Sequence, residues 1–231
     1  METKKFGIIG DPVAHSLSPV LFRAAYGGRY AYELIEGADF EASWHRFLDA
    51  YAGINVTAPF KIAALGRSDV PSPECLRIGA TNLVVKTPDG TAAFNSDYRG
   101  VKALLEPLPR GSAAVIGFGG AGKAALAAAE DMGFTATVFR HGEIRSGVRA
   151  DVIIFTLPRP AEGVDRFECD CLIEANYKDP TFAGERLERL EEAGVQYISG
   201  LRWLLSQAVT GYALMTGQEP DRIAMEAALA P

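Results

Sequence analysis

The sequence lacks the features that mark membrane, secreted and nucleic-acid-binding proteins. No run of about 18 apolar residues occurs in the 231-residue chain, and its first ten residues, METKKFGIIG, lack the hydrophobic core of a signal peptide. The formal net charge is −6 and no long basic run is present, which argues against nucleic acid as a partner. We therefore expect a cytoplasmic protein with neither a membrane nor a nucleic-acid partner.

Cysteine is scarce as well. The three cysteines are Cys75, Cys169 and Cys171, and no Cys-x-x-Cys pair occurs. An odd number without paired spacing is typical of a reduced cytoplasmic protein. Cys169 and Cys171 could in principle bind metal, but no histidine lies near them in the sequence. We expect ordinary cysteines and no bound metal.

The first hundred residues alternate between strand and helix signals. Hydrophobic residues make up 48% of the chain, which is ordinary for a globular protein. A helix is expected to start with Ser18 as its N-cap, and a hairpin is expected around Asp89-Gly90. Strand and helix alternation predicts an α/β fold with a mainly parallel sheet. Residues 4–12 are expected to form a strand followed by a turn at Gly10 and Pro12, and residues 18–28 contain a helix that ends before Gly27. Strands are also expected at 30–37 and 54–60, a helix at 42–53 and the hairpin at 81–97.

A second α/β unit follows a helix-breaking stretch at 105–111. Residues 112–139 are expected to form a strand, a glycine turn, a helix and a strand, and further strands are expected in 151–158 and 171–177. The tail from Leu201 has helical spacing, and by its pattern it could pack on either domain. We therefore place domains at 1–104 and 105–200, followed by a C-terminal helical segment at 201–231.

The glycine turn has the spacing of a dinucleotide-binding site. Gly117, Gly119 and Gly122 match G-x-G-x-x-G between an expected strand and an expected helix, where such glycines let the backbone approach a pyrophosphate. An ordinary glycine-rich turn is the alternative. The next strand ends near Arg140 instead of an acidic residue, which favours NADP over NAD because arginine can bind the 2′-phosphate.

Six segments together resemble the shikimate dehydrogenase family, in the same order and nearly from end to end. The cofactor turn is one of them, and the stretch Gly53 to Lys61, GINVTAPFK, is similar to the family's GxNVTxPxK. The others are HSLSP (15–19), GATNLV (79–84), NSDYRG (95–100) and SGLRWLLSQA (199–208).

The resemblance implies an N-terminal α/β substrate domain, a Rossmann-like NADP-binding domain and a C-terminal helix that returns to the first domain. It also implies reversible, NADPH-dependent reduction of 3-dehydroshikimate to shikimate in aromatic amino-acid biosynthesis. Lys61 would be the catalytic lysine and Asp97 its partner. The implied substrate-binding residues are Ser16, Ser18, Thr57, Asn82, Asp97, Tyr177 and Gln207. The implied cofactor-binding residues are Gly117, Phe118, Gly119, Gly120, Ala121, Gly122, Arg140, Gly200 and Trp203.

The residues fit this chemistry. When a carbonyl carbon receives hydride, its oxygen gains negative charge and then a proton, and an ammonium within hydrogen-bond distance can stabilise the charge and supply the proton. Two serine hydroxyls near a helix start suit a carboxylate. The plainer alternatives are that Lys61 is a solvated lysine at a strand end and that Ser18 only caps its helix.

The sequence departs from the family pattern in three places. The family's NRT turn is here Phe139-Arg140-His141, and Trp203 replaces a methionine that packs against the nicotinamide. Only residues 140–150 separate the second strand of the cofactor domain from the next, too few for the helix and strand that the family places there. We therefore expect a shortened cofactor domain.

Two other functions remain open at this stage. A paralogue on the same fold could act on quinate or an aminated analogue, with NAD as a possible cofactor. A non-catalytic ligand-binding relative is the second alternative, although Lys61, Asp97 and the glycine turn argue against it. We expect a small-molecule substrate and either a monomer or a homodimer.

Overall fold

The computed structural model describes residues 4–158 and 162–230. The chain divides into two compact units. Unit 1 comprises residues 1–96 and 208–231, and unit 2 comprises residues 97–207. Both units are α/β, as the sequence predicts.

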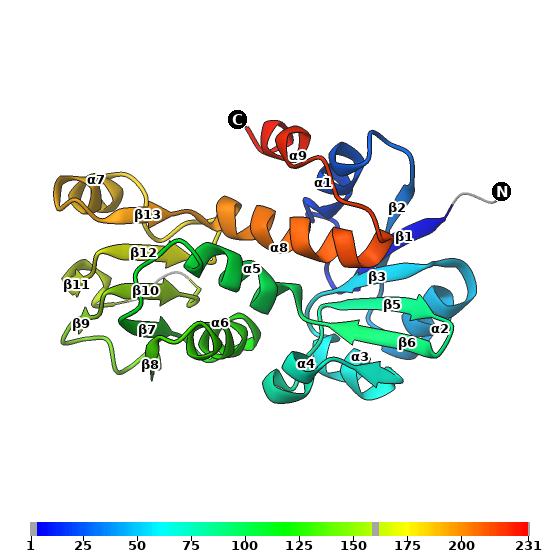
Figure 1. Ribbon diagram of the computed structural model, residues 1–231, viewed down its shortest axis with the longest axis horizontal. Coiled ribbons are helices and arrows are strands. Elements are labelled where there is room, and N and C mark those ends of the chain that lie inside the picture. Colours follow the sequence, from blue (N-terminus) through cyan, green and yellow to red (C-terminus); the bar gives the residue numbers. More distant parts are fainter. Residues whose placement is uncertain (1–3, 159–161, 231) are drawn as a thin grey trace. The chain divides into compact units, whose positions relative to one another are not determined.

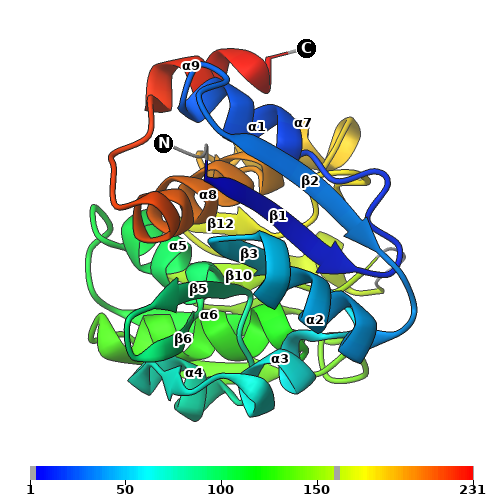
Figure 2. The same ribbon diagram turned by 90° about the vertical axis from the view of Figure 1, so that its right-hand side faces the viewer.

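Unit 1 is built on a six-stranded mixed sheet with the order β2-β1-β3-β5-β6-β4. Strand β1 runs parallel to β2 and β3, whereas β5 is antiparallel to both β3 and β6 (Figure 2). The strands are β1 (Lys5–Gly10), β2 (Ala31–Glu36), β3 (Gly53–Val56), β4 (Val70–Pro71), β5 (Leu83–Thr87) and β6 (Gly90–Phe94). The helices are α1 (Ser18–Ala25), α2 (Phe40–Ala50), α3 (Lys61–Arg67), α4 (Pro73–Ile78) and α9 (Arg222–Ala228).

The two faces of this sheet have different cores. On one face, Trp44 and Phe47 of α2 pack with Ile9, Ile54 and Val84 of the sheet. The other face carries an aromatic cluster, which we define as Phe6, Phe22, Tyr26, Tyr30, Tyr32 and Tyr212. Helix α9 packs on α1 (Figures 1 and 2).

Unit 2 contains a five-stranded parallel sheet with the order β13-β12-β10-β7-β8. Its strands are β7 (Ser112–Ile116), β8 (Thr135–Phe139), β10 (Val152–Phe155), β12 (Cys171–Glu174) and β13 (Gln196–Ile198). Its helices are α5 (Ser96–Leu105), α6 (Gly120–Asp131), the 3-10 helix η1 (Val164–Arg166), α7 (Glu185–Glu192) and the first half of α8 (Gly200–Thr216). The short strands β9 (Val148–Arg149) and β11 (Phe167–Glu168) pair only with each other.

The chain between β8 and β10 is as short as the sequence predicts. Residues 141–146 form turns, and β9 does not join the main sheet. Strand β8 is therefore the last strand on its side of the sheet (Figure 1).

The unit boundaries differ from the positions placed by sequence at 104/105 and 200/201. Helix α5 belongs to unit 2 from Asp97 on, because Val101 and Leu105 pack in the core of that unit. Helix α8 changes unit after Gln207, and its Tyr212 lies in the aromatic cluster of unit 1.

Candidate active site

Lys61 is the first residue of helix α3, and not the end of a strand as the sequence suggested. Strand β3 already ends at Val56, and the turn that follows is fixed by two backbone hydrogen bonds, Thr57 N to Ile9 O at 3.0 Å and Phe60 N to Thr57 O at 3.0 Å. The half-buried Lys61 accepts at its carbonyl oxygen from Thr81 N at 3.1 Å. This lysine is therefore held on a fixed backbone next to the segment that carries Asn82.

Asn82 directly precedes β5 and is hydrogen-bonded to β3 and to the first residue of α5. Its Oδ1 accepts from the backbone N of Ser96 at 2.7 Å and from the Ser96 hydroxyl at 3.2 Å. Its carbonyl oxygen accepts from Val56 N at 2.9 Å. The Asn82 side chain is nearly buried, and among the described residues its Nδ2 has no hydrogen-bond partner. An amide donor is thus fixed in place for a ligand oxygen.

The half-buried Tyr32 supports Asn82, and sequence analysis missed it. The Tyr32 hydroxyl donates to Asn55 Oδ1 at 2.7 Å, and Asn55 Nδ2 donates to the carbonyl oxygen of Asn82 at 3.3 Å. The pKa of Tyr32 is raised well above its usual value, mainly by burial and secondly by the nearby Tyr212. The Tyr32 hydroxyl therefore stays protonated and remains a donor. The polar Asn55 inside an apolar strand was the signal available in the sequence.

The two predicted carboxylate-binding serines lie together. Ser16 Oγ donates to Ser18 Oγ at 3.1 Å and accepts from Ser18 N at 3.2 Å. Leu17, and not Ser18, is the N-cap of α1, and no side chain caps the helix. Both serines are half-buried. Two adjacent hydroxyls at an uncapped helix start can donate to a carboxylate.

Asp97 and Gln207 lie on two helices of unit 2 that cross at Gly100. A Cβ on Gly100 would lie 2.7 Å from Gln207 N, and Ser206 Oγ donates to the Gly100 carbonyl at 2.9 Å. Asp97, one turn before Gly100 on α5, is nearly buried, and Gln207 is half-buried. The glycine in NSDYRG thus has a physical role, because only a residue without Cβ allows the helices this close approach.

The three glycines of the turn have distinct environments. Gly117 has φ +101°, where glycine is favoured, and its N donates to Phe139 O at 2.8 Å. A Cβ on Gly122 would lie 2.1 Å from the Gly117 carbonyl oxygen, whereas one on Gly119 would meet nothing within 4 Å. Gly119 is the N-cap of α6, and Gly120 and Ala121 open the helix without a side-chain cap. The uncapped amides at this helix start suit a phosphate group.

Two cations flank the exposed Phe118 of this turn. The Arg140 guanidinium lies 5.8 Å from the Phe118 ring centroid, and Lys123 Nζ lies 5.7 Å from it. Arg140 is exposed, and its backbone N donates to Glu143 Oε2 at 2.6 Å. His141 is exposed next to it. Sequence analysis missed Lys123, although its place in the first turn of α6 could have indicated a phosphate ligand.

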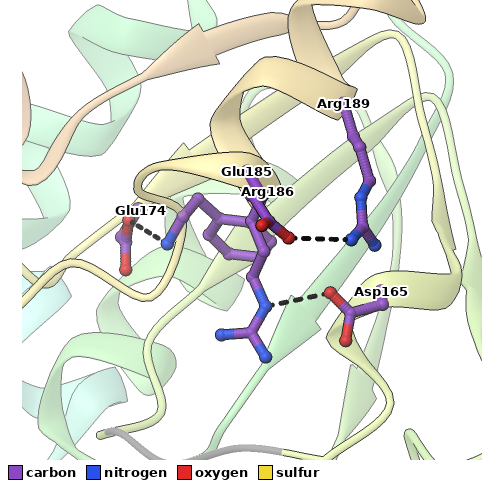
Figure 3. Close-up of polar contacts among 6 residues, drawn as sticks. Asp165, Glu174, Glu185, Arg186 and Arg189 are labelled. Atoms are coloured by element: carbon purple, nitrogen blue, oxygen red, sulfur yellow. Dashed lines mark hydrogen bonds and ion pairs between the residues drawn. The ribbon is translucent and has the colours of Figure 1, made fainter.

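The fully buried Glu174 fixes the loop that carries Tyr177 through hydrogen bonds. Glu174 Oε1 accepts from Thr181 N at 2.6 Å, and Oε2 accepts from Phe182 N at 3.4 Å (Figure 3) and from the Tyr197 hydroxyl at 2.7 Å. Burial raises the pKa of the half-buried Tyr177. The charged residue within the apolar strand CLIE could have identified this support.

Gly200 and Trp203 have packing roles. A Cβ on Gly200 would lie 2.4 Å from the Asn176 carbonyl, so the start of α8 packs directly against the loop that carries Tyr177. Trp203 is only 3% exposed and packs in the core of unit 2 with Val101 and Ile198. Little of its surface is left for the cofactor contact that the sequence suggested.

A cavity of about 350 Å³ in unit 2 contains none of the predicted site residues. Phe167, Phe182 and Leu190 line it, and Arg186 Nε donates to Asp165 Oδ1 at 2.9 Å beside it (Figure 3). Within the described residues, no helix is long and apolar enough to cross a membrane. No group of three or more potential metal ligands occurs there either.

Comparison with known proteins identifies the relatives. Residues 8–84 match the model of the shikimate dehydrogenase substrate binding domain. A shikimate dehydrogenase (NADP(+)) of Thermus thermophilus is 33% identical, over 97% of this chain and 97% of the relative. The chain belongs to the shikimate dehydrogenase family. A Halorubrum lacusprofundi member of the family is 32% identical over the same shares of both chains.

Solved structures of the family agree in fold. The Thermus thermophilus enzyme in complex with NADP(H) and shikimate superposes with a TM-score of 0.84 at 28% identity, over 98% of both chains. The Mycobacterium tuberculosis shikimate dehydrogenase gives 0.83 at 29% identity, also over 98% of both chains.

The family comparison also shows that this chain is shorter than the relative it matches. The alignment with the first Thermus thermophilus relative runs over 260 positions, although 97% of this chain is only about 224 residues. About 36 positions therefore lie opposite gaps in this chain. This chain is a shortened member of the shikimate dehydrogenase family.

Proposed function

We propose that this protein is a shikimate dehydrogenase that interconverts 3-dehydroshikimate and shikimate with NADP(H). The observation that carries the proposal is the relation at 33% identity over nearly all of both chains to an NADP-dependent family member. The three free cysteines support a cytoplasmic location as part of the proposal, because thiols stay reduced there.

The glycine turn and its two cations fit the phosphates of NADP. The uncapped amides at the start of α6 would bind the pyrophosphate, with Gly119 as the position of close approach. Arg140 would bind the 2′-phosphate, because a guanidinium can donate two parallel hydrogen bonds to it. Lys123 would add positive charge at the same turn. When bound, NADPH supplies the hydride.

Lys61 is the proposed proton donor of the reduction. Its ammonium would hydrogen-bond the carbonyl oxygen of 3-dehydroshikimate, stabilise the negative charge that develops there and transfer a proton to it. In the reverse direction the neutral amine would take the proton from the hydroxyl. The fixed start of α3 supports this role, since the lysine backbone is already held by Thr81.

The other polar residues would bind the substrate. Ser16 and Ser18 would donate to its carboxylate, and Asn82 Nδ2 would donate to a ring hydroxyl. Asp97 would accept from a hydroxyl. Thr57, Tyr177 and Gln207 complete the proposed set. The hydrogen bonds that hold Asn82 and the Tyr177 loop favour fixed positions for these residues.

The test is direct. Shikimate and NADP⁺ are mixed with the purified protein, and the NADPH absorbance band is followed. We expect turnover with this pair and much less with quinate or with NAD⁺. Faster turnover with quinate or NAD⁺ than with shikimate and NADP⁺ would instead identify a paralogue on the same fold. Tight shikimate binding without turnover of any pair would make the protein a ligand-binding relative.

A further inference from the structure

Strand β8 presents an open edge of the unit 2 sheet. It pairs only with β7, in parallel. Thr135 N donates to Gly111 O and Phe139 O accepts from Gly117 N, so the backbone groups of odd-numbered residues face β7. Those of Ala136 and Val138 therefore point away from the sheet. Among the described residues, these outward backbone groups have no hydrogen-bond partner.

The chain that leaves β8 does not cover this edge with a strand. Ile144 is fully buried among Ile116, Ile153 and Phe155, so the segment turns onto one face of the sheet. The next strand, β9, pairs with β11 instead of β8. Thr137 in the middle of β8 is exposed.

The other sheet edges carry features that discourage strand pairing, and β8 carries none. In natural proteins, charged residues, proline or short length keep edge strands from pairing with other chains. Strand β2 contains Glu33 and Glu36, β4 contains Pro71, and β13 is only three residues long. The sequence of β8 is TATVF, which has no charge, no proline and no glycine.

We propose that β8 is a self-association surface and that its occupant is β8 of a second copy of this chain. Two-fold symmetric pairing of one edge with itself is antiparallel. With Thr137 on the two-fold axis, Ala136 lies opposite Val138 of the other copy, and the outward backbone groups form hydrogen-bonded pairs. Because the strand is uncharged, no like charges face each other across the pairing. The inference is independent of the proposed function.

The contact is small. Each copy contributes one five-residue strand, well below the area of a standard stable interface. We therefore expect a reversible dimer whose population rises with protein concentration, and not an obligate one.

The first test measures mass in solution. Sedimentation velocity of the full chain over about a hundredfold range of concentration should show the average mass rising toward twice that of the monomer. Thr137→Lys should raise the dimer dissociation constant about tenfold or more, because two ammonium groups would meet on the axis. Gln196→Lys, an exposed position on the opposite edge strand of the same sheet, is the matched control and should associate like wild type.

The second test fixes the register. Directly opposite residues in a non-hydrogen-bonded antiparallel pair have Cα atoms about 4.5 Å apart, within disulfide range. Thr137→Cys should therefore give a covalent dimer on mild oxidation, seen on a non-reducing gel, while wild type and Gln196→Cys should not. A wild-type chain that is monomeric throughout, a Thr137→Lys variant that associates like wild type, or equal cross-linking at positions 137 and 196 would each overturn the proposal.

Discussion

Gly122 faces the Gly117 carbonyl so closely that a Cβ on Gly122 would lie 2.1 Å from that oxygen. A Cβ on Gly119, between them, would meet nothing within 4 Å. The two glycines therefore serve different purposes. Gly122 allows α6 to pack against the turn, whereas Gly119 leaves open space next to its own Cα atom.

Alanine at each of these glycines should separate folding from binding. Gly122→Ala should lower the free energy of unfolding by about 1–3 kcal/mol, the usual range for an overpacked site. Gly119→Ala should change it by less than about 0.5 kcal/mol but weaken NADP binding about tenfold or more, because the methyl group stands where the pyrophosphate approaches. Thermal unfolding and cofactor titration measure both effects. Unchanged NADP binding in Gly119→Ala would contradict the placement of the pyrophosphate.

Removal of the Lys61 amine should abolish most of the activity. Lys61→Ala should lower turnover by about two to four orders of magnitude, the range for a lost acid-base group, and should weaken shikimate binding much less. Lys4→Ala, at an exposed position in the same unit, serves as the control and should keep wild-type turnover. Near-normal turnover in Lys61→Ala would remove this lysine from the mechanism.

The serine pair should determine recognition of the substrate carboxylate. Ser16→Ala combined with Ser18→Ala should weaken shikimate binding, since each hydrogen bond to a charged group contributes about 1.5–3 kcal/mol. The methyl ester of shikimate, which wild type should bind poorly, should be discriminated against less by the double variant. Ser146→Ala, exposed in unit 2, controls for the loss of a hydroxyl. Normal shikimate binding by the double variant would place the carboxylate elsewhere.

Arg140 and Lys123 should affect the cofactors differently. Arg140→Ala should bring the NADP and NAD affinities close to parity, because a charge-assisted bond to the 2′-phosphate contributes about 1.5–3 kcal/mol. Lys123→Ala should weaken both cofactors alike and keep the preference, since both carry the pyrophosphate. Titration of each variant with each cofactor distinguishes these outcomes. An unchanged preference in Arg140→Ala would contradict its assignment.

Asp151 should make stability depend on acid pH. The backbone N–H of Ser112 donates to Asp151 Oδ2 at 2.6 Å and its hydroxyl donates at 2.7 Å, and these bonds lower the pKa of Asp151 below its ordinary 3.8. The stabilisation is therefore present above pH 3.8 and is lost as the pH falls toward the lower pKa of the folded state. The difference in Tm between wild type and Asp151→Asn should shrink over that window. A difference that stays constant with pH would contradict this coupling.

Much of the fold could be predicted because local signals agreed with it. Strand β1 and the glycine turn have unambiguous patterns, and the shortness of residues 140–150 correctly predicted the missing helix and strand. The start of α3 could not be predicted in this way. The apolar stretch INVTAPF continues through Phe60 without a change of period, while Phe60 is buried because it enters the core beside α3.

The supports of the candidate site were harder to predict than its polar residues. Lys61, Asn82 and Arg140 stand in motifs, but the Tyr32 hydroxyl reaches Asn55 from a different strand. Such a contact depends on strand order, which no local pattern specifies. Trp203 illustrates the opposite case. A residue in a motif position is buried in the core, and its packing partners come from distant segments.

Because α8 is divided between the units, it determines which of the two units can fold completely first during synthesis. All of unit 2, residues 97–207, leaves the ribosome before the segment that finishes unit 1. That segment supplies Tyr212, which is buried against Phe22 and donates to the Ser18 carbonyl at 3.1 Å. The unit that is translated first is therefore completed last, and its aromatic face stays uncovered in the nascent chain until residues 208–231 emerge.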